Sequence, residues 1–179
     1  MKKYLLGLMS IVMMAVVCVG FAACGSDDDG DGSGGSSNNC ANVNGKNIAV
    51  PYGFYSYEGE WILTFTNYDV NNPQTYPSSI NYLSINISNS PKGDGVPVGE
   101  FSPIQVYVVY NASRSSEGEQ YESGYDGDSG KGKVNISKNG DVYTVTYSGV
   151  NLIRHGDKKT FENTSFSWSG RLTEAHFDD

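Results

Sequence analysis

Alternation of apolar and polar side chains restricts the fold of this chain more than any other feature. Trp61, Leu63 and Phe65 alternate with the residues between them, and residues 83–87 repeat the pattern. Side chains at every second position of a strand share one face, so each run places an apolar row on one side of a sheet. Beyond residue 23 the chain has only four leucines and four alanines, so strong helix formers are scarce. We therefore predict an all-β fold.

Further runs predict where other strands lie. Residues 105–110 (Gln-Val-Tyr-Val-Val-Tyr) are apolar on both faces, which is typical of a central strand. Asn139-Gly140 separates two alternating runs and favours a type I′ hairpin, because both central residues need a positive φ. A strand over 163–173 contains Gly170, which indicates a bulge or a close approach of another segment. Antiparallel strands with short links predict either an antiparallel β-sandwich or a small up-and-down, lipocalin-like β-barrel.

The first residues of the chain have the pattern of an export signal. Lys2 and Lys3 precede an apolar run over residues 4–23, and small residues precede Cys24. These are the three parts of a secretory signal, so we predict that residues 1–23 are removed. Two or more acyl chains on the new N-terminal cysteine would then hold the protein firmly in a membrane. The alternative is that the same apolar run spans the membrane as a helix.

The residues around this cysteine resemble known lipoprotein signals. Residues 21–24 (Phe-Ala-Ala-Cys) resemble a bacterial lipobox, and the serine and acids that follow resemble the export signal of surface-exposed lipoproteins of Bacteroidetes. The resemblance implies a lipid-anchored outer-membrane protein that faces outward, and the same acids also suit a solvated linker. The residues of the predicted export signal are Ser26, Asp27, Asp28 and Asp29.

A second, looser resemblance concerns the folded part of the chain. Residues 95–101, 132–145 and 169–172 are similar to turns and core positions of small, uncharacterised β-domains in Bacteroidetes lipoproteins. These positions belong to turns and to the core, and none of them is catalytic. The resemblance therefore implies an all-β domain and no activity.

Composition divides the chain and excludes one class of partner. Residues 24–44 are polar and rich in glycine, so we predict a flexible tether, and residues 45–179 are long enough for one domain. Without Lys2 and Lys3, 10 of the 12 basic residues remain against 20 acidic ones, a net charge of −10. This charge repels phosphate backbones, so we expect no nucleic-acid binding. With Cys24 acylated, Cys40 would be the one thiol of the mature chain, too few for an intramolecular disulfide.

Exposed aromatic side chains are the best candidates for ligand binding. Amphipathic rings commonly contact sugars and protein surfaces, and aromatic residues are denser around residue 55 than one buried face needs. The candidate ligand-binding residues are Tyr52, Tyr55, Tyr57 and Trp61.

Motifs for catalysis, metals and cofactors are missing from the sequence. We predict a non-enzyme with no cofactor and no metal site, because no nucleophile elbow, zinc motif or phosphate loop occurs. Glu58 and Glu60 favour a hairpin turn over a glycosidase carboxylate pair, and His155 favours a solvated turn. The acidic loop over 113–133 leaves calcium binding open beside a plain hairpin loop.

Two functions fit these observations. The first is a non-catalytic binding module at the cell surface, for a glycan, a small ligand or a host protein. The second is a structural or assembly component of an outer-membrane or surface complex.

The anchoring signals predict separable effects of substitution. Cys24→Ala should abolish palmitate labelling and release the protein from membranes, because the acylated residue is gone. Replacing Asp27, Asp28 and Asp29 by alanine should keep the protein lipidated but inaccessible to protease added to intact cells. A periplasmic protein in the same cells is the control. Unchanged surface digestion of the triple variant would refute the export signal.

Overall fold

A computed structural model describes residues 39–72, 74, 76–87, 93, 95–123 and 132–176. The predicted signal peptide, Cys24 and residues 26–29 lie outside the described residues and stay predictions. Asp126 and Asp128, on which calcium binding by the 113–133 loop would depend, also lie outside the described residues. None of the described residues belongs to a helix long and apolar enough to span a bilayer.

Twelve strands are formed within this described part of the chain. They are β1 (Cys40–Val43), β2 (Lys46–Ala49), β3 (Tyr52–Tyr57), β4 (Trp61–Thr66), β5 (Ile80–Ile87), β6 (Gly99–Phe101), β7 (Pro103–Ala112), β8 (Glu119–Glu122), β9 (Lys133–Asn139), β10 (Val142–Arg154), β11 (Thr160–Gly170) and β12 (Leu172–Glu174).

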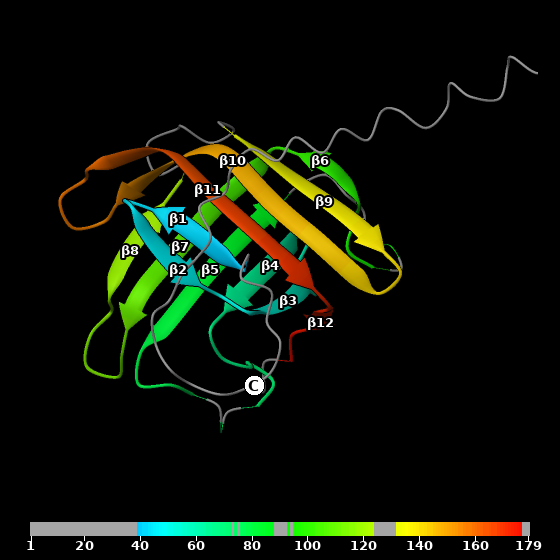
Figure 1. Ribbon diagram of the computed structural model, residues 1–179, viewed down its shortest axis with the longest axis horizontal. Helices are drawn as coiled ribbons and strands as arrows, with labels where there is room; N and C mark the ends of the chain where they lie inside the picture. Colours follow the sequence, from blue (N-terminus) through cyan, green and yellow to red (C-terminus); the bar gives the residue numbers. More distant parts are fainter. Residues whose placement is uncertain are drawn as a thin grey trace, which may run out of the picture.

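All of these strands belong to a single sheet. Its order is β12-β3-β4-β5-β7-β8-β10-β11-β1-β2, with β9 paired to β10 and β6 paired to β9. The pairs are antiparallel, except that β12 runs parallel to β3. The sheet curls into a half-barrel, with β10 and β11 on one side and β4, β5 and β7 on the other (Figure 1). The predicted all-β fold is confirmed, and one curled sheet takes the place of two stacked sheets.

Two long strands produce the curl. The first half of β10 pairs with β9, and its last residues pair with β8. The register between β10 and β11 shifts between Tyr147 and Val150, where Gly149 adopts φ +68°. Such a bulge bends a strand and increases its twist. After Arg171 the chain of β11 continues as β12 on the edge of β3, so one segment runs from β11, near one end of the sheet order, to β12 at the other end.

The strands expected from alternation are present, with one correction at a turn. Residues 61–66 and 83–87 lie in β4 and β5, and residues 105–110 lie in β7 between β5 and β8. The β9–β10 hairpin is confirmed, but Asn139 pairs with Val142 and stays in the strand. Gly140 is therefore the first central residue of the turn, with φ +58°. A glycine in the first central position is typical of a type II′ turn, so the predicted type I′ turn is wrong.

The core lies between the two sides of the curl. The ring of Phe65 in β4 has its centroid 4.7 Å from that of Phe166 and 5.2 Å from that of Trp168, both in β11. All three side chains are buried, as are the inward-facing residues of the neighbouring strands. Each fully buried side chain of this size contributes roughly 1.5–3 kcal/mol. Side-chain packing thus joins strands that are far apart in the sheet order.

The folded domain begins earlier than the predicted boundary at residue 45. The tail of the predicted tether forms β1, and Ala41 and Val43 are completely buried. Asn44 and Gly45 adopt φ of 55° and 70°, so the type I′ Asn-Gly turn occurs here, between β1 and β2. The predicted tether over 24–44 is therefore too long, because its last residues belong to the folded domain.

The β1–β2 hairpin is fastened at both ends. The side chain of Asn39 donates to the carbonyl oxygen of Ser169 (3.2 Å) and accepts from its N–H (2.9 Å). At the turn, Lys46 pairs with Glu119 of β8. Hydrogen bonds from Lys46 and Tyr121 lower the pKa of the Glu119 carboxyl below its usual value. The hairpin therefore bridges β11 and β8.

Glycine is required where Trp168 crosses the start of β3. A Cβ at Gly53 would lie 2.5 Å from Cζ2 of Trp168, and one at Gly170 would lie 2.8 Å from the same atom. Real Cβ atoms do not approach other atoms so closely. The neighbour of Gly170 is the indole of Trp168 in the same strand, so the approach of another segment predicted there is not what the structure shows; such an approach occurs at Gly53, where β11 meets β3.

This contact predicts a large effect of one added methyl group. Gly53→Ala should lower the free energy of unfolding by about 1–3 kcal/mol, because the buried indole has no room to move. Urea denaturation of the full-length chain measures the change. Gly156→Ala is the matched control, since a Cβ there meets nothing within 4 Å, and it should change stability by less than about 0.5 kcal/mol. Equal stability of the two variants would contradict the packing described above.

Candidate functional site

Three of the four predicted ligand-binding residues come together at the β3–β4 hairpin. Tyr57 lies opposite Trp61 in the register, and Tyr55 is two residues away on the same face. The ring centroids of Tyr57 and Trp61 are 5.1 Å apart at 66°, and those of Tyr55 and Trp61 are 6.0 Å apart at 53°. Tilted and edge-to-face pairs of this kind are favourable ring arrangements. We call these three residues the aromatic cluster.

The members of the aromatic cluster differ in exposure. Trp61 is 2% exposed and belongs to the core, so it is not the exposed ring that the sequence suggested. Tyr55 and Tyr57 are half-buried and pack against the core with part of each ring at the surface. A ligand at this place would first contact the two tyrosines.

The indole of Trp61 is chemically unusual. Its Nε1 is buried and has no hydrogen-bond partner in the described part of the chain. By contrast, Nε1 of Trp168 donates to the carbonyl oxygen of Pro51 at 3.2 Å. A buried donor left without an acceptor costs about 1–3 kcal/mol, and such groups are rare in folded proteins. The aromatic cluster therefore holds an unused hydrogen-bond donor.

Polar groups from three other strands lie around Tyr55. Burial raises the pKa of its hydroxyl, and Glu174 of β12 and Tyr143 of β10 add to this effect. Lys138 of β9 lies over the Tyr143 ring, with Nζ 4.8 Å from the centroid. A hydrogen bond to Tyr143 raises the pKa of Lys138. The aromatic cluster thus has hydroxyl groups, one ammonium and one carboxylate around it, a set that can form hydrogen bonds with a polar ligand.

Tyr52 is separate from the aromatic cluster. Odd positions of β3 face the core, so Tyr52 lies on the opposite face, where it is 43% exposed. It lines a different depression, together with Asp69, Asn71 and Arg171. The Asn71 side chain is engaged there, donating to the carbonyl oxygen of Glu174 and accepting from the N–H of His176. The four predicted residues therefore do not form one site.

The titratable residues considered for catalysis are Glu58, Glu60 and His155, and all three lie in turns between strands. The predicted turn at Glu58 and Glu60 is confirmed, with the N–H of Glu58 donating to the carbonyl oxygen of Glu60 at 3.0 Å. One carboxylate oxygen of Glu60 accepts from Asn86 of β5 at 2.8 Å. His155 lies in the turn after β10, as predicted.

A contact of His155 was not predicted. Its Nε2 lies 2.9 Å from Oε2 of Glu122 in β8, and its ring centroid is 5.9 Å from that of Tyr107. Gln105 donates to the other carboxylate oxygen of Glu122. Burial, and then the nearby Glu122 charge, raises the pKa of Tyr107. The pairing of β8 with β10 brings this histidine to its carboxylate, and no local pattern in the sequence signals that pairing.

Side chains that could ligate a metal are not clustered among the residues that the structure describes. No group of three or more His, Cys, Asp or Glu side chains among them is gathered as metal ligands would be. The contact between His155 and Glu122 joins β8 to the turn after β10.

Comparison with known proteins adds no family to this description. No family model matches the chain, and no curated protein or solved structure is significantly similar to it. Function is therefore inferred from the side chains of the aromatic cluster and of the residues around it.

Proposed function

We propose that this protein is a lipid-anchored, surface-exposed lipoprotein of the outer membrane that acts as a non-catalytic binding module. Its anchor would be Cys24, and its ligand site the aromatic cluster. The ligand would be a glycan, a small molecule or a host protein. The lipobox-like residues 21–24 and the acids after them support the location, and the aromatic cluster supports the activity.

One observation carries the binding proposal. Two half-buried tyrosines stand over a buried indole whose N–H has no acceptor among the described residues. A ligand that brings an oxygen to this donor would satisfy it, and the tyrosine rings would supply apolar contact area. Sugars and peptide carbonyls both offer such oxygens.

The charges around the cluster support binding over catalysis. A tyrosine whose pKa is raised, such as Tyr55, stays protonated at neutral pH and is a poor general base. The carboxylate of Glu60 is already held by Asn86. These residues therefore offer hydrogen bonds to a ligand and no activated nucleophile.

A matched pair of substitutions tests the cluster. The full-length chain in detergent is screened against glycans and small ligands for a rise in melting temperature, because a ligand that binds only the folded state stabilises it. Tyr57→Ala should then weaken binding of the hit about tenfold or more. Tyr52→Ala is the control, since this residue is on the same strand but faces away, and it should leave affinity within about twofold.

Two results would count against the binding module. Equal loss of affinity in the two variants would remove the site from the aromatic cluster. If no ligand changes the melting temperature and the anchored chain instead co-purifies with a membrane complex, the assembly role is the better description.

A further inference from the structure

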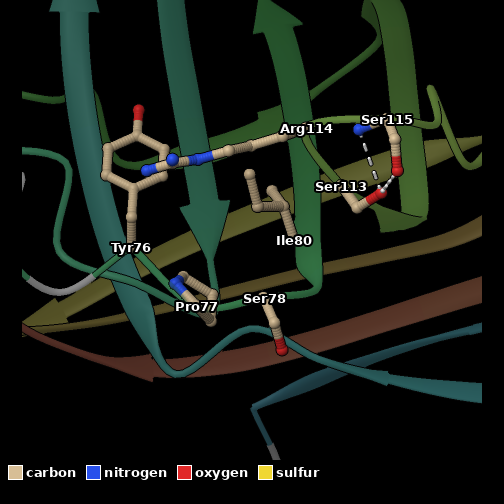
Figure 2. Close-up of a pocket in the computed structure, with 7 residues that line it drawn as sticks. All are labelled: Tyr76, Pro77, Ser78, Ile80, Ser113, Arg114 and Ser115. Carbon is tan, nitrogen blue, oxygen red and sulfur yellow. Dashed lines mark hydrogen bonds between the residues drawn. The ribbon is translucent and has the colours of Figure 1, made fainter.

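A second depression lies at the start of β5 and the end of β7, away from the aromatic cluster. It has a volume of about 390 Å³, within the range of small-molecule sites. Figure 2 shows its walls as two short segments, one from the β4–β5 connection and one from the β7–β8 turn. The lining residues are Tyr76, Pro77, Ser78, Ile80, Ser113, Arg114 and Ser115.

Arg114 supplies an unused positive charge to this depression. Of the three arginines in the described ranges, Arg154 pairs with Asp157 and Arg171 pairs with Asp141, whereas Arg114 has no carboxylate partner. Its side chain is exposed and extends from the turn across the depression toward Tyr76 (Figure 2). A guanidinium has five donors in a planar fork that matches a carboxylate. Arg114 is therefore available to an anion from outside the chain.

The turn that carries Arg114 is well defined. Ser113 and Ser116 exchange both backbone hydrogen bonds, at 2.7 Å and 3.2 Å, so Arg114 and Ser115 occupy the tip of a tight turn. The hydroxyls of Ser113 and Ser115 lie 3.3 Å apart beside the arginine. Two hydroxyl groups and one guanidinium are thus presented together.

The two walls are tied to each other by hydrogen bonds. The hydroxyl of Ser79 donates to Oδ1 of Asn111 at 2.6 Å, and the N–H of Asn111 donates to Oδ1 of Asn81 at 3.1 Å. Nδ2 of Asn67 also donates to the carbonyl oxygen of Ser79 at 2.9 Å. These bonds connect the loop that holds Tyr76 to the strand that ends at Arg114. A site whose walls are already ordered loses less entropy when a ligand binds.

Tyr76 provides a flat apolar surface opposite the arginine. It is 52% exposed, the second most exposed large hydrophobic residue with an assigned position. Its ring centroid lies 4.5 Å from that of Tyr68, tilted by 31°. Tyr68 is buried, so it supports the Tyr76 ring from behind and leaves the remainder open. Rings supported in this way suit contact with the C–H face of a sugar.

We propose that this depression binds an acidic sugar. The sugar carboxylate would pair with the Arg114 guanidinium, its ring would lie on Tyr76, and its hydroxyls would bond to Ser78, Ser113 and Ser115. Because the whole chain carries a net charge of −8, long-range electrostatics do not favour an anion, and selectivity would come from the local guanidinium. This site is independent of the aromatic cluster proposed above.

A charged ligand and its neutral ester test the proposal. Tetragalacturonic acid and its fully methyl-esterified form are titrated into the full-length chain in detergent by calorimetry. The acid should bind about tenfold or more tightly than the ester, with affinity that falls as salt is added. Arg114→Gln should abolish this preference. Arg171→Gln is the control, since it removes the same charge from an exposed arginine outside the depression, and it should keep the preference.

The outcomes separate this site from the aromatic cluster. Tyr76→Ala should weaken both ligands, while Tyr57→Ala should leave the preference for the acid intact. Equal affinity of acid and ester, retained preference in Arg114→Gln, or no binding of either ligand would each overturn the proposal. An unchanged melting temperature of the apo variants shows that they remain folded.

Discussion

Packing of Phe65 on Phe166 and Trp168 is the interaction on which the rest of the structure depends. The sheet order ends at β12 and β2, so backbone hydrogen bonds do not close the curl between these two strands. Its two sides are held together by the continuous β11–β12 segment, whose β12 part pairs with β3, and by side chains from β4 and β11. The glycines at positions 53 and 170 belong to the same arrangement, because the Trp168 indole occupies the space that their side chains would take. Ring contacts thus stabilise the half-barrel together with the backbone hydrogen bonds between its strands.

Much of the fold could be predicted from the sequence because apolar and polar residues alternate strongly in several strands. The runs in β4 and β5 have large apolar residues at every second position, and these residues are buried, although Thr64, Thr66 and Ser84 between them are buried as well. The hairpin at β1–β2 was missed although it contains an Asn-Gly pair. Its strands have four residues each and follow a polar, glycine-rich stretch, so Ala41, Val43 and Ile48 give too short a pattern to stand out. Curvature of the sheet depends on bulges and on long-range packing, which local patterns do not encode.

The binding residues were predicted in part for a similar reason. Residue type placed Tyr52, Tyr55 and Tyr57 among the candidates, but the period of a strand sends the first to one face and the others to the opposite face. Trp61 belonged both to an apolar row and to the candidate binding residues, because tryptophan suits surfaces and cores, and the structure places it in the core. Tyr76 and Arg114 were not singled out. They are 38 positions apart in the numbering and meet because β5 pairs with β7.

The fastening of Asn39 to Ser169 has a mechanical consequence. Any tension on the chain before residue 39 acts first on these two hydrogen bonds and on the one that the Asn39 carbonyl oxygen accepts from the N–H of Val50, and then on β1. Because β1 is loaded from its end, its bonds to β11 would open one after another rather than together. Removal of β1 would expose Ala41 and Val43 to water and uncover the edge of β11 that pairs with it. A pull on the N-terminal side would therefore unfold this protein from the strand nearest the pulled end, starting at a single asparagine.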